Sequence, residues 1–170
     1  MVAVTMNSKP QILDCHKRKD EHFWLVKFAP FRTSWADIVK RGTFTLRGVR
    51  STVSRNHLSQ MRLGEEVLLY HSQQELAIVG VMEVTREAYP DPTSADPRWL
   101  TCDFAPVTTL AHPVSLATLK ADTRFVTFGL IRQPRLAVMP VSESQFNGIM
   151  DLAAYAAPAH SITGLRGTGP

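Results

Sequence analysis

Residues 48–72 (GVRSTVSRNHLSQMRLGEEVLLYHS) predict four elements in close succession, and this succession limits the folds open to the chain. A basic loop leads into a short helix that carries Leu58 and Met61 inward at helical spacing. Gly64 ends the helix, and an apolar run over residues 66–71 predicts a buried strand. Elements as short as these are not typical of the βαβ units of a parallel sheet.

The rest of the chain continues this irregular alternation of short strands and short helices. Strands are predicted over residues 23–28, 77–85 and 135–139, with a short extended piece over residues 43–47. Residues 98–104 and 106–111 are predicted to form two more strands or one bent pair. Helices are predicted over residues 34–40, after Ser115, and over residues 142–155, each behind a capping residue. Gly80 is expected at a bulge or a close approach, and the Pro- and Asp-rich residues 89–97 in an irregular loop. This order predicts an α+β fold, a small mixed β-barrel with helices packed outside.

Length and composition fit one folded domain. A chain of 170 residues can bury roughly 70% of its unfolded surface. We expect a flexible leader over residues 1–21, a domain over residues 22–155 and a flexible tail over residues 156–170. No apolar run is long enough to cross a bilayer, so we expect no membrane partner.

The two cysteines, Cys15 and Cys102, are far apart and lack the spacing of a zinc site. We therefore expect neither a metal nor another cofactor. Two separate thiols fit a reducing compartment, so we expect a cytoplasmic location, or a nuclear one in a eukaryote.

Positive charge is concentrated in one window of the chain. Residues 38–64 contain no Asp or Glu and hold six basic side chains, Lys40, Arg41, Arg47, Arg50, Arg55 and Arg62. The whole chain has a net charge of only +4, so the rest of it is net acidic. A local basic surface beside a strand that ends in Tyr70, His71 and Ser72 indicates a site for an anion, and nucleic acid is the partner we expect.

Five segments occur in an order that resembles the EVE domain family, over residues 23–152. They are FWLVKFAP, the stretch over residues 48–72, IVGVMEVTREAYPDPT, DPRW and RLAVMPVS. The resemblance implies a PUA-like fold, in which a small, strongly curved sheet closes toward a barrel flanked by helices. It also implies a relation to YTH domains, which read methylated adenine in RNA, and the binding of a modified base in a pocket.

The chain departs from the family pattern at three places, one of which is Val53, where members often have the Gln of N-x-Q-A-R-N. Members commonly read K-S-E-P at the end of the first strand, where this chain has KFAP, and W-D-G-V-R-N where it has LRGVRS. By the resemblance, the Trp replaced by Leu46 would be one wall of a base cage. The replacement of Asp by Arg47 makes the site more positive.

Eleven residues are candidates for binding nucleic acid or a base: Trp24, Lys27, Leu46, Arg47, Arg50, Ser51, Arg55, Asn56, Tyr70, His71 and Ser72. Arginines can contact phosphates, an Asn side chain can read a base edge, and aromatic faces can hold unstacked bases. Several have a plainer interpretation. Trp24 fits a core residue, Asn56 a local cap and Lys27 the solvent face of a strand. Tyr70 and His71 alternate along one strand, so we expect one of them in the core.

We predict a non-catalytic nucleic-acid-binding module that recognises a modified or unpaired base in DNA or RNA, through a pocket beside the basic surface. The alternative is a small-molecule or anion sensor that uses the same pocket without nucleic acid. A third hypothesis is a nucleotide-processing enzyme with His71 as acid or base. The chain lacks G-x-S-x-G, a P-loop and the zinc deaminase motifs, which disfavours catalysis. The modification, the choice of DNA or RNA and the oligomeric state stay open.

Overall fold

The computed structural model describes residues 22–154, so the predicted leader and tail lie outside the described residues. The strands are β1 (Phe23–Phe28), β2 (Phe44–Thr45), β3 (Glu66–His71), β4 (Ala77–Pro90), β5 (Leu100–Ser115) and β6 (Val138–Val141). The helices are α1 (Trp35–Arg41), α2 (Thr52–Gln60), α3 (Leu116–Ala121), α4 (Gly129–Arg132), α5 (Glu143–Ala154) and the 3-10 turn η1 (Thr123–Phe125). None of the helices within residues 22–154 has the length and apolar character needed to span a membrane.

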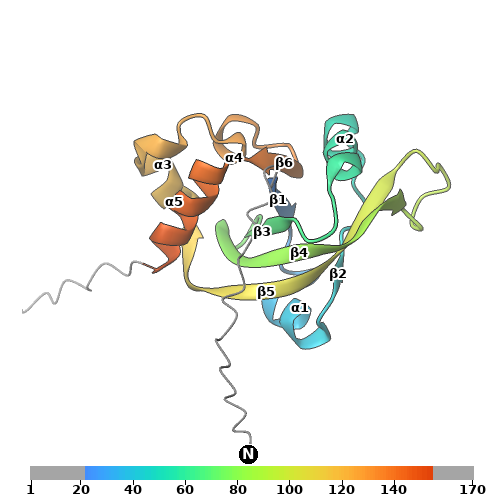
Figure 1. Cartoon of the computed structure of the whole chain (residues 1–170), viewed down its shortest axis with the longest axis horizontal. Coiled ribbons are helices and arrows are strands. Elements are labelled where there is room, and N and C mark those ends of the chain that lie inside the picture. The colour runs from blue at the N-terminus through green and yellow to red at the C-terminus, as the bar shows by residue number, and fades with distance from the viewer. Residues whose placement is uncertain (1–21, 155–170) are drawn as a thin grey trace, which may run out of the picture.

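One six-stranded mixed sheet organises this part of the chain, in the order β2-β5-β4-β3-β1-β6. The long strands β4 and β5 bend strongly, with α3, α4 and α5 gathered at one end of the sheet (Figure 1). The predicted α+β class is confirmed. Closure into a barrel is not shown, because within residues 22–154 no ladder joins the edge strands β2 and β6.

β1 and β3 run parallel, whereas the other neighbouring strands are antiparallel. The short elements had argued against parallel pairing. A parallel pair needs a connection of a dozen or more residues. Residues 29–65 provide it, and they include α1, β2 and α2 rather than one long helix.

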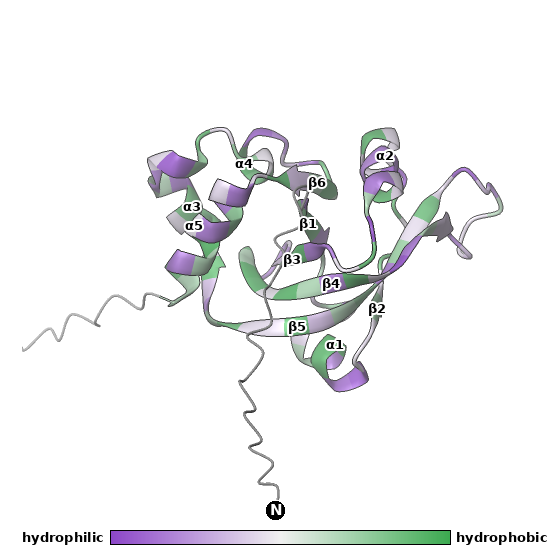
Figure 2. Cartoon of the chain, viewed as in Figure 1, coloured by the Kyte–Doolittle hydropathy of each residue, from purple (hydrophilic) through white to green (hydrophobic). Residues whose placement is uncertain are grey.

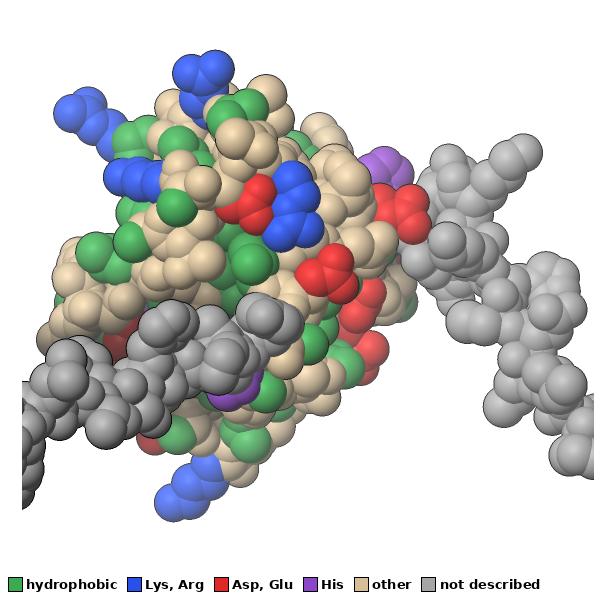
Figure 3. All heavy atoms as spheres, turned by 90° about the vertical axis from the view of Figure 1, so that its left-hand side faces the viewer, with side chains coloured by type: hydrophobic (Ala, Val, Ile, Leu, Met, Phe, Trp, Pro, Cys, Tyr) green, Lys and Arg blue, Asp and Glu red, His purple; other side chains and the backbone are tan. Residues whose placement is uncertain are grey.

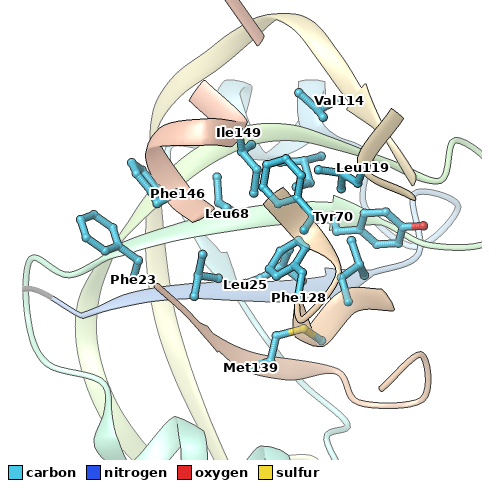
Figure 4. Close-up of a cluster of buried hydrophobic side chains, with 14 of the residues drawn as sticks. Phe23, Leu25, Leu68, Tyr70, Val114, Leu119, Phe128, Met139, Phe146 and Ile149 are labelled. Carbon is cyan, nitrogen blue, oxygen red and sulfur yellow. The ribbon is translucent and has the colours of Figure 1, made fainter. Parts of the chain in front are cut away.

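Two apolar clusters lie on the two faces of the sheet. Phe23 and Leu25 of β1 belong to one cluster, and Trp24 and Val26 to the other, as alternation along a strand requires. In the first cluster, side chains of α3 and α5 pack against β1 and β3 (Figure 4). Figure 2 shows these helices partly green and partly purple, the pattern of an amphipathic helix on a sheet. The second cluster includes side chains of α1 and α2.

Local capping signals position the helices. Ser34 and Asp37 form a capping box at α1, and Gly42 ends this helix with a φ of 71°. Ser51 caps α2 by accepting a hydrogen bond from the Ser54 amide. The caps predicted at α1, α3 and α5 are confirmed.

The β4–β5 hairpin is longer and more continuous than predicted. β4 runs through Pro90, which pairs with Leu100, so the irregular loop is shorter than residues 89–97. β5 is one continuous strand that includes most of the two segments predicted as two strands or one bent pair. Register shifts interrupt the ladder at four places, and such bulges let one long hairpin bend. β6 begins at Val138, later than the predicted residue 135.

Gly80 lies at one of these register shifts and beneath the Trp35 indole. A Cβ atom at Gly80 would overlap carbon atoms of that ring. Trp35 Nε1 also donates to Thr109 Oγ1 of β5 at 2.9 Å. The predicted bulge and close approach are confirmed, and together they let α1 rest directly on the sheet.

Candidate nucleic-acid interface

A hollow of about 320 Å³ lies beside the C-terminal end of β1, and we call it the cationic pocket. It is lined by Lys27, Phe28, Ala29, Phe31, Arg32, Leu46, Arg47, Gly48, Val49, Arg50, Ser51, Ser72, Gln73, Arg135 and Ala137. Five of these residues are Lys or Arg, and none is Asp, Glu or His. The lining therefore presents one sign of charge to a ligand, next to the buried side chains of Leu46 and Val49.

Strand pairing brings distant segments together at this pocket. The Ser72 amide donates to the Phe28 carbonyl at 2.9 Å, which places the turn after β3 on one side of β1. On the other side, the Lys27 amide donates to the Ala137 carbonyl at 2.8 Å. The pocket thus lies where β1 ends between β3 and β6, and the loop over residues 46–51 completes its wall.

Lys27 is part of the pocket wall rather than a freely solvated side chain. Its ammonium group donates to the Pro134 carbonyl and lies 6.0 Å from the centre of the Tyr70 ring. Partial burial lowers the pKa of Lys27 below its usual value, because desolvation penalises the charged form. An anion in the pocket would compensate for that desolvation.

A buried carboxylate, Asp91, holds the loop that completes the pocket. Its Oδ2 accepts from Arg50 Nη1 at 2.8 Å and from the Gly48 amide at 3.0 Å. Its Oδ1 accepts from the amide and the hydroxyl of Thr93. Burial favours the neutral acid, but these hydrogen bonds outweigh it and hold the pKa of Asp91 well below its usual range. The sequence pattern had indicated only a turn at Asp91.

Arg50 and Arg55 both lie near Trp99, each with its guanidinium carbon 5.9 Å from the ring centre. Arg50 lines the pocket, but it is paired with Asp91 and therefore positions the loop as well as adding charge. Arg55 and Asn56, on α2, are not in the lining, and Arg55 Nη2 donates to Asn56 Oδ1 at 3.2 Å. Only a ligand that extends beyond the pocket could contact these two residues.

Two further hollows share lining residues with the cationic pocket. One, of about 310 Å³, shares Phe28, Arg32 and Arg47 and is completed by Thr33, Arg41, Thr43, Phe44 and Thr45. The other, of about 410 Å³, shares Ser51 and Arg135 and is completed by Gln133, Pro134 and Leu136. Among the described residues, none of the three linings contains a carboxylate, and we call the three hollows together the basic groove. By contrast, acidic and basic side chains both lie on the face that carries α3 and α5 (Figure 3).

Three predicted site residues are buried outside the pocket lining. Trp24 lies in the second apolar cluster and donates to Glu65 at 2.7 Å, and Tyr70 lies in the first cluster. The His71 side chain is 2% exposed, with Nδ1 2.5 Å from a Glu75 carboxylate oxygen. Its buried Nε2 has no hydrogen-bond partner within residues 22–154. The expectation that only one of Tyr70 and His71 is buried is wrong, because both faces of β3 are covered.

Six of the eleven predicted residues do meet at the cationic pocket: Lys27, Leu46, Arg47, Arg50, Ser51 and Ser72. The sequence pattern did not single out Phe31, Arg32 or Arg135, which the structure also places there. Phe31 and Arg32 follow the first predicted strand closely, and Arg135 opens the last one. Their positions next to predicted strand ends were the feature of the sequence that could have indicated these residues.

Comparison with known proteins relates the chain to a family. The model of the EVE domain matches residues 22–152. Human thymocyte nuclear protein 1 is 28% identical over an alignment of 173 residues. The match covers 82% of this chain and 76% of that protein. A crystal structure of a protein from Agrobacterium tumefaciens is 32% identical, covers 81% of this chain and 96% of that chain, and has a TM-score of 0.77.

A crystal structure of human THYN1 in complex with 5-methylcytosine containing DNA is also similar. It is 26% identical, covers 80% of this chain and 99% of that chain, and has a TM-score of 0.72. The family match spans all but two residues of the described part of the chain. The chain therefore belongs to the EVE domain family, as the order of its five segments predicted.

Proposed function

We propose that the chain binds nucleic acid and holds a modified or unpaired base in the cationic pocket. The observation that carries this proposal is the lining, which within residues 22–154 combines five cations, no carboxylate and an apolar wall in a hollow of about 320 Å³. Cations suit phosphates, and an apolar wall suits a planar base. The structure of the homologue human THYN1 with 5-methylcytosine containing DNA supports the same class of ligand.

The two kinds of lining residue suit two parts of a nucleotide. Leu46 and Val49 are buried, whereas Arg32 and Arg47 are exposed. A base in the pocket would meet apolar surface while its phosphates stay near the guanidinium groups. Pockets for small ligands range over about 300–1,000 Å³, so this one, at the lower end, suits a single base.

A binding role is better supported than catalysis. The part of the lining that residues 22–154 supply contains no Asp, Glu, His or Cys, the side chains that most often transfer protons or act as nucleophiles. His71, the candidate acid or base, is buried outside the lining. The chain is therefore proposed to act as a binding module.

Fluorescence anisotropy with labelled oligonucleotides tests the proposal. Single- and double-stranded DNA and RNA, with cytosine or 5-methylcytosine at one position, are titrated with the protein at two salt concentrations. Arg47→Glu and Arg135→Glu should abolish binding, because each reverses a charge in the lining. Lys120→Glu makes the same charge change on α3, outside the basic groove, and should bind like the wild type. Circular dichroism establishes that each variant is folded.

The outcomes separate three functions. Tighter binding of the 5-methylcytosine oligonucleotide would establish base recognition. Salt-dependent binding that ignores the modification would limit the function to backbone contacts. If no oligonucleotide binds and a free nucleotide raises the melting temperature, the small-ligand alternative is favoured. Wild-type affinity in both arginine variants would contradict the proposed site.

A further inference from the structure

Phe31 is the most exposed large hydrophobic residue within residues 22–154, and it lies in the lining of the cationic pocket. It is 62% exposed, and the guanidinium carbon of Arg32 lies 5.9 Å from its ring centre. The six other exposed large hydrophobic residues in that part of the chain are Val or Leu, and none lines this pocket. Single exposed apolar residues are normal, so the informative feature is the position of this one.

The other apolar side chains of the lining are already packed. Phe28 is half-buried and lies edge-on to Phe44, with ring centres 4.9 Å apart and an angle of 73° between the planes. Leu46 is 2% exposed and has no aromatic face. Phe31 is therefore the lining residue whose aromatic ring is available to a planar ligand.

A proline turn holds Phe31 at the pocket. The Arg32 amide donates to the Ala29 carbonyl at 3.1 Å, which closes a four-residue turn with Pro30 in its second position. Proline there fixes its own φ and reduces the conformations open to the unbound chain. A ring presented from such a turn loses little freedom when a ligand stacks on it, which favours binding.

We propose that Phe31 is the stacking face for the base that enters the cationic pocket, with Arg32 and Arg47 beside the flanking phosphates. This inference rests on the proposed function and specifies its ligand as an unpaired nucleobase within a strand. A phenyl ring stacks on the π face of any base, so Phe31 contributes affinity for unpaired bases in general. Discrimination of a modification then depends on the inner wall, where Leu46 and Val49 lie.

Two DNA duplexes test the inference. One contains a single unpaired cytosine, and the other has an abasic site at the same position. Phe31→Ala should weaken binding to the first duplex by about 5- to 150-fold, the range expected when one base loses its aromatic partner. Phe31→Trp should bind at least as tightly as the wild type, and Phe31→Leu should lie between wild type and Phe31→Ala. On the abasic duplex all four proteins should bind alike.

Leu63→Ala is the matched control, since Leu63 is also exposed and apolar but lies outside the groove. It should leave both affinities unchanged. Melting temperatures of the variants should equal that of the wild type, because the exposed Phe31 side chain contributes little to the core.

Each contrary result has a distinct meaning. If the wild type binds and Phe31→Ala binds equally well, stacking is overturned while nucleic-acid binding stands. An equal loss on both duplexes also overturns it, because the contact would then be with the backbone. If the wild type binds neither duplex nor any other oligonucleotide, the proposed function fails and this inference fails with it.

Discussion

Arg50 reaches across 41 positions of sequence to Asp91, whose side chain has no solvent exposure, and its Nη1 lies 2.8 Å from the carboxylate Oδ2. The pair connects the loop over residues 46–51 to the tip of the β4–β5 hairpin. Because the same oxygen accepts from the Gly48 amide, the shape of the pocket wall depends on a residue that does not line the pocket.

Asp91→Asn should therefore weaken both the fold and oligonucleotide binding. Asn keeps the size of the side chain but loses the charge. Its NH2 group replaces one carboxylate oxygen and cannot accept a hydrogen bond from the donors that surround Asp91. A hydrogen bond to a charged group contributes about 1.5–3 kcal/mol, and we expect the free energy of unfolding in urea to fall by that order. Thr93→Val, which removes one hydroxyl donor, should lose less. An unchanged unfolding free energy in Asp91→Asn would show that other contacts hold the loop.

The pKa of Asp91 also predicts sensitivity to acid. Its pKa is lower in the folded than in the unfolded protein, so the ionised form stabilises the fold. This contribution is fully present above the unfolded-state pKa of about 3.9 and is lost as the pH falls toward the folded-state value. The melting temperature should therefore fall less in Asp91→Asn than in the wild type between roughly pH 5 and pH 3. Parallel declines in the two proteins would contradict the assignment.

The hollow that contains Arg41 should bind a phosphate next to the base. Arg41→Gln removes one positive charge, so affinity for modified and unmodified oligonucleotides should fall by the same factor. The slope of log affinity against log salt concentration should decrease by about 0.7–0.9, the value for one phosphate contact. Lys120→Gln, outside the groove, should leave the slope unchanged. A loss confined to the modified oligonucleotide would contradict a phosphate role.

Gly80→Ala should destabilise the protein without changing the binding surface. The added methyl group would overlap the Trp35 indole, and overpacking of this kind costs about 1–3 kcal/mol. Chemical denaturation measures the loss. The double variant Gly80→Ala, Trp35→Leu should lose less than the sum of the single variants, because the smaller side chain removes the overlap. Additive losses would locate the strain elsewhere.

His71→Gln should lower stability but not oligonucleotide affinity. The His71 ring is buried beside Glu75 and does not line the pocket, so its loss affects the end of β3 rather than the ligand. The His71 side chain is 2% exposed, so a substitute that packs less well should lower the unfolding free energy by about 0.5–3 kcal/mol. Affinity is compared by anisotropy at a temperature where both proteins are folded. A folded variant with much weaker binding would make His71 part of the site.

Elements with complete local signals could be predicted from the sequence. The capping box of Ser34 and Asp37 and the left-handed Gly42 delimit α1, and the apolar run of β3 has the bounds expected of it. Each of these signals lies within a few residues of the element that it determines. The β4–β5 hairpin was misjudged because Pro90 ordinarily ends a strand, whereas here the pairing with Leu100 continues past the local pattern.

The candidate site was less predictable because its residues meet only through long-range pairing. Charge density indicated Arg47 and Arg50, but nothing near Arg50 in the sequence shows that a carboxylate 41 positions away is its partner. Phe31 follows the first strand as an ordinary loop residue, and only the three-dimensional arrangement places its ring beside the basic side chains. His71 was a candidate because its side chain can donate or accept a proton, but it is buried and does not line the pocket.

The parallel arrangement of β1 and β3 has a consequence for how such a protein can change its ligand. Because β1 and β3 are parallel, the chain must return from the end of β1 to the starting edge of the sheet before β3 begins. Residues 29–65 form this crossover connection. Most residues of the pocket wall belong to this crossover connection, whereas the hydrogen-bond ladders beside the pocket are formed by the strands. Substitutions in the crossover connection can therefore change which ligand binds while the sheet that supports the pocket remains the same.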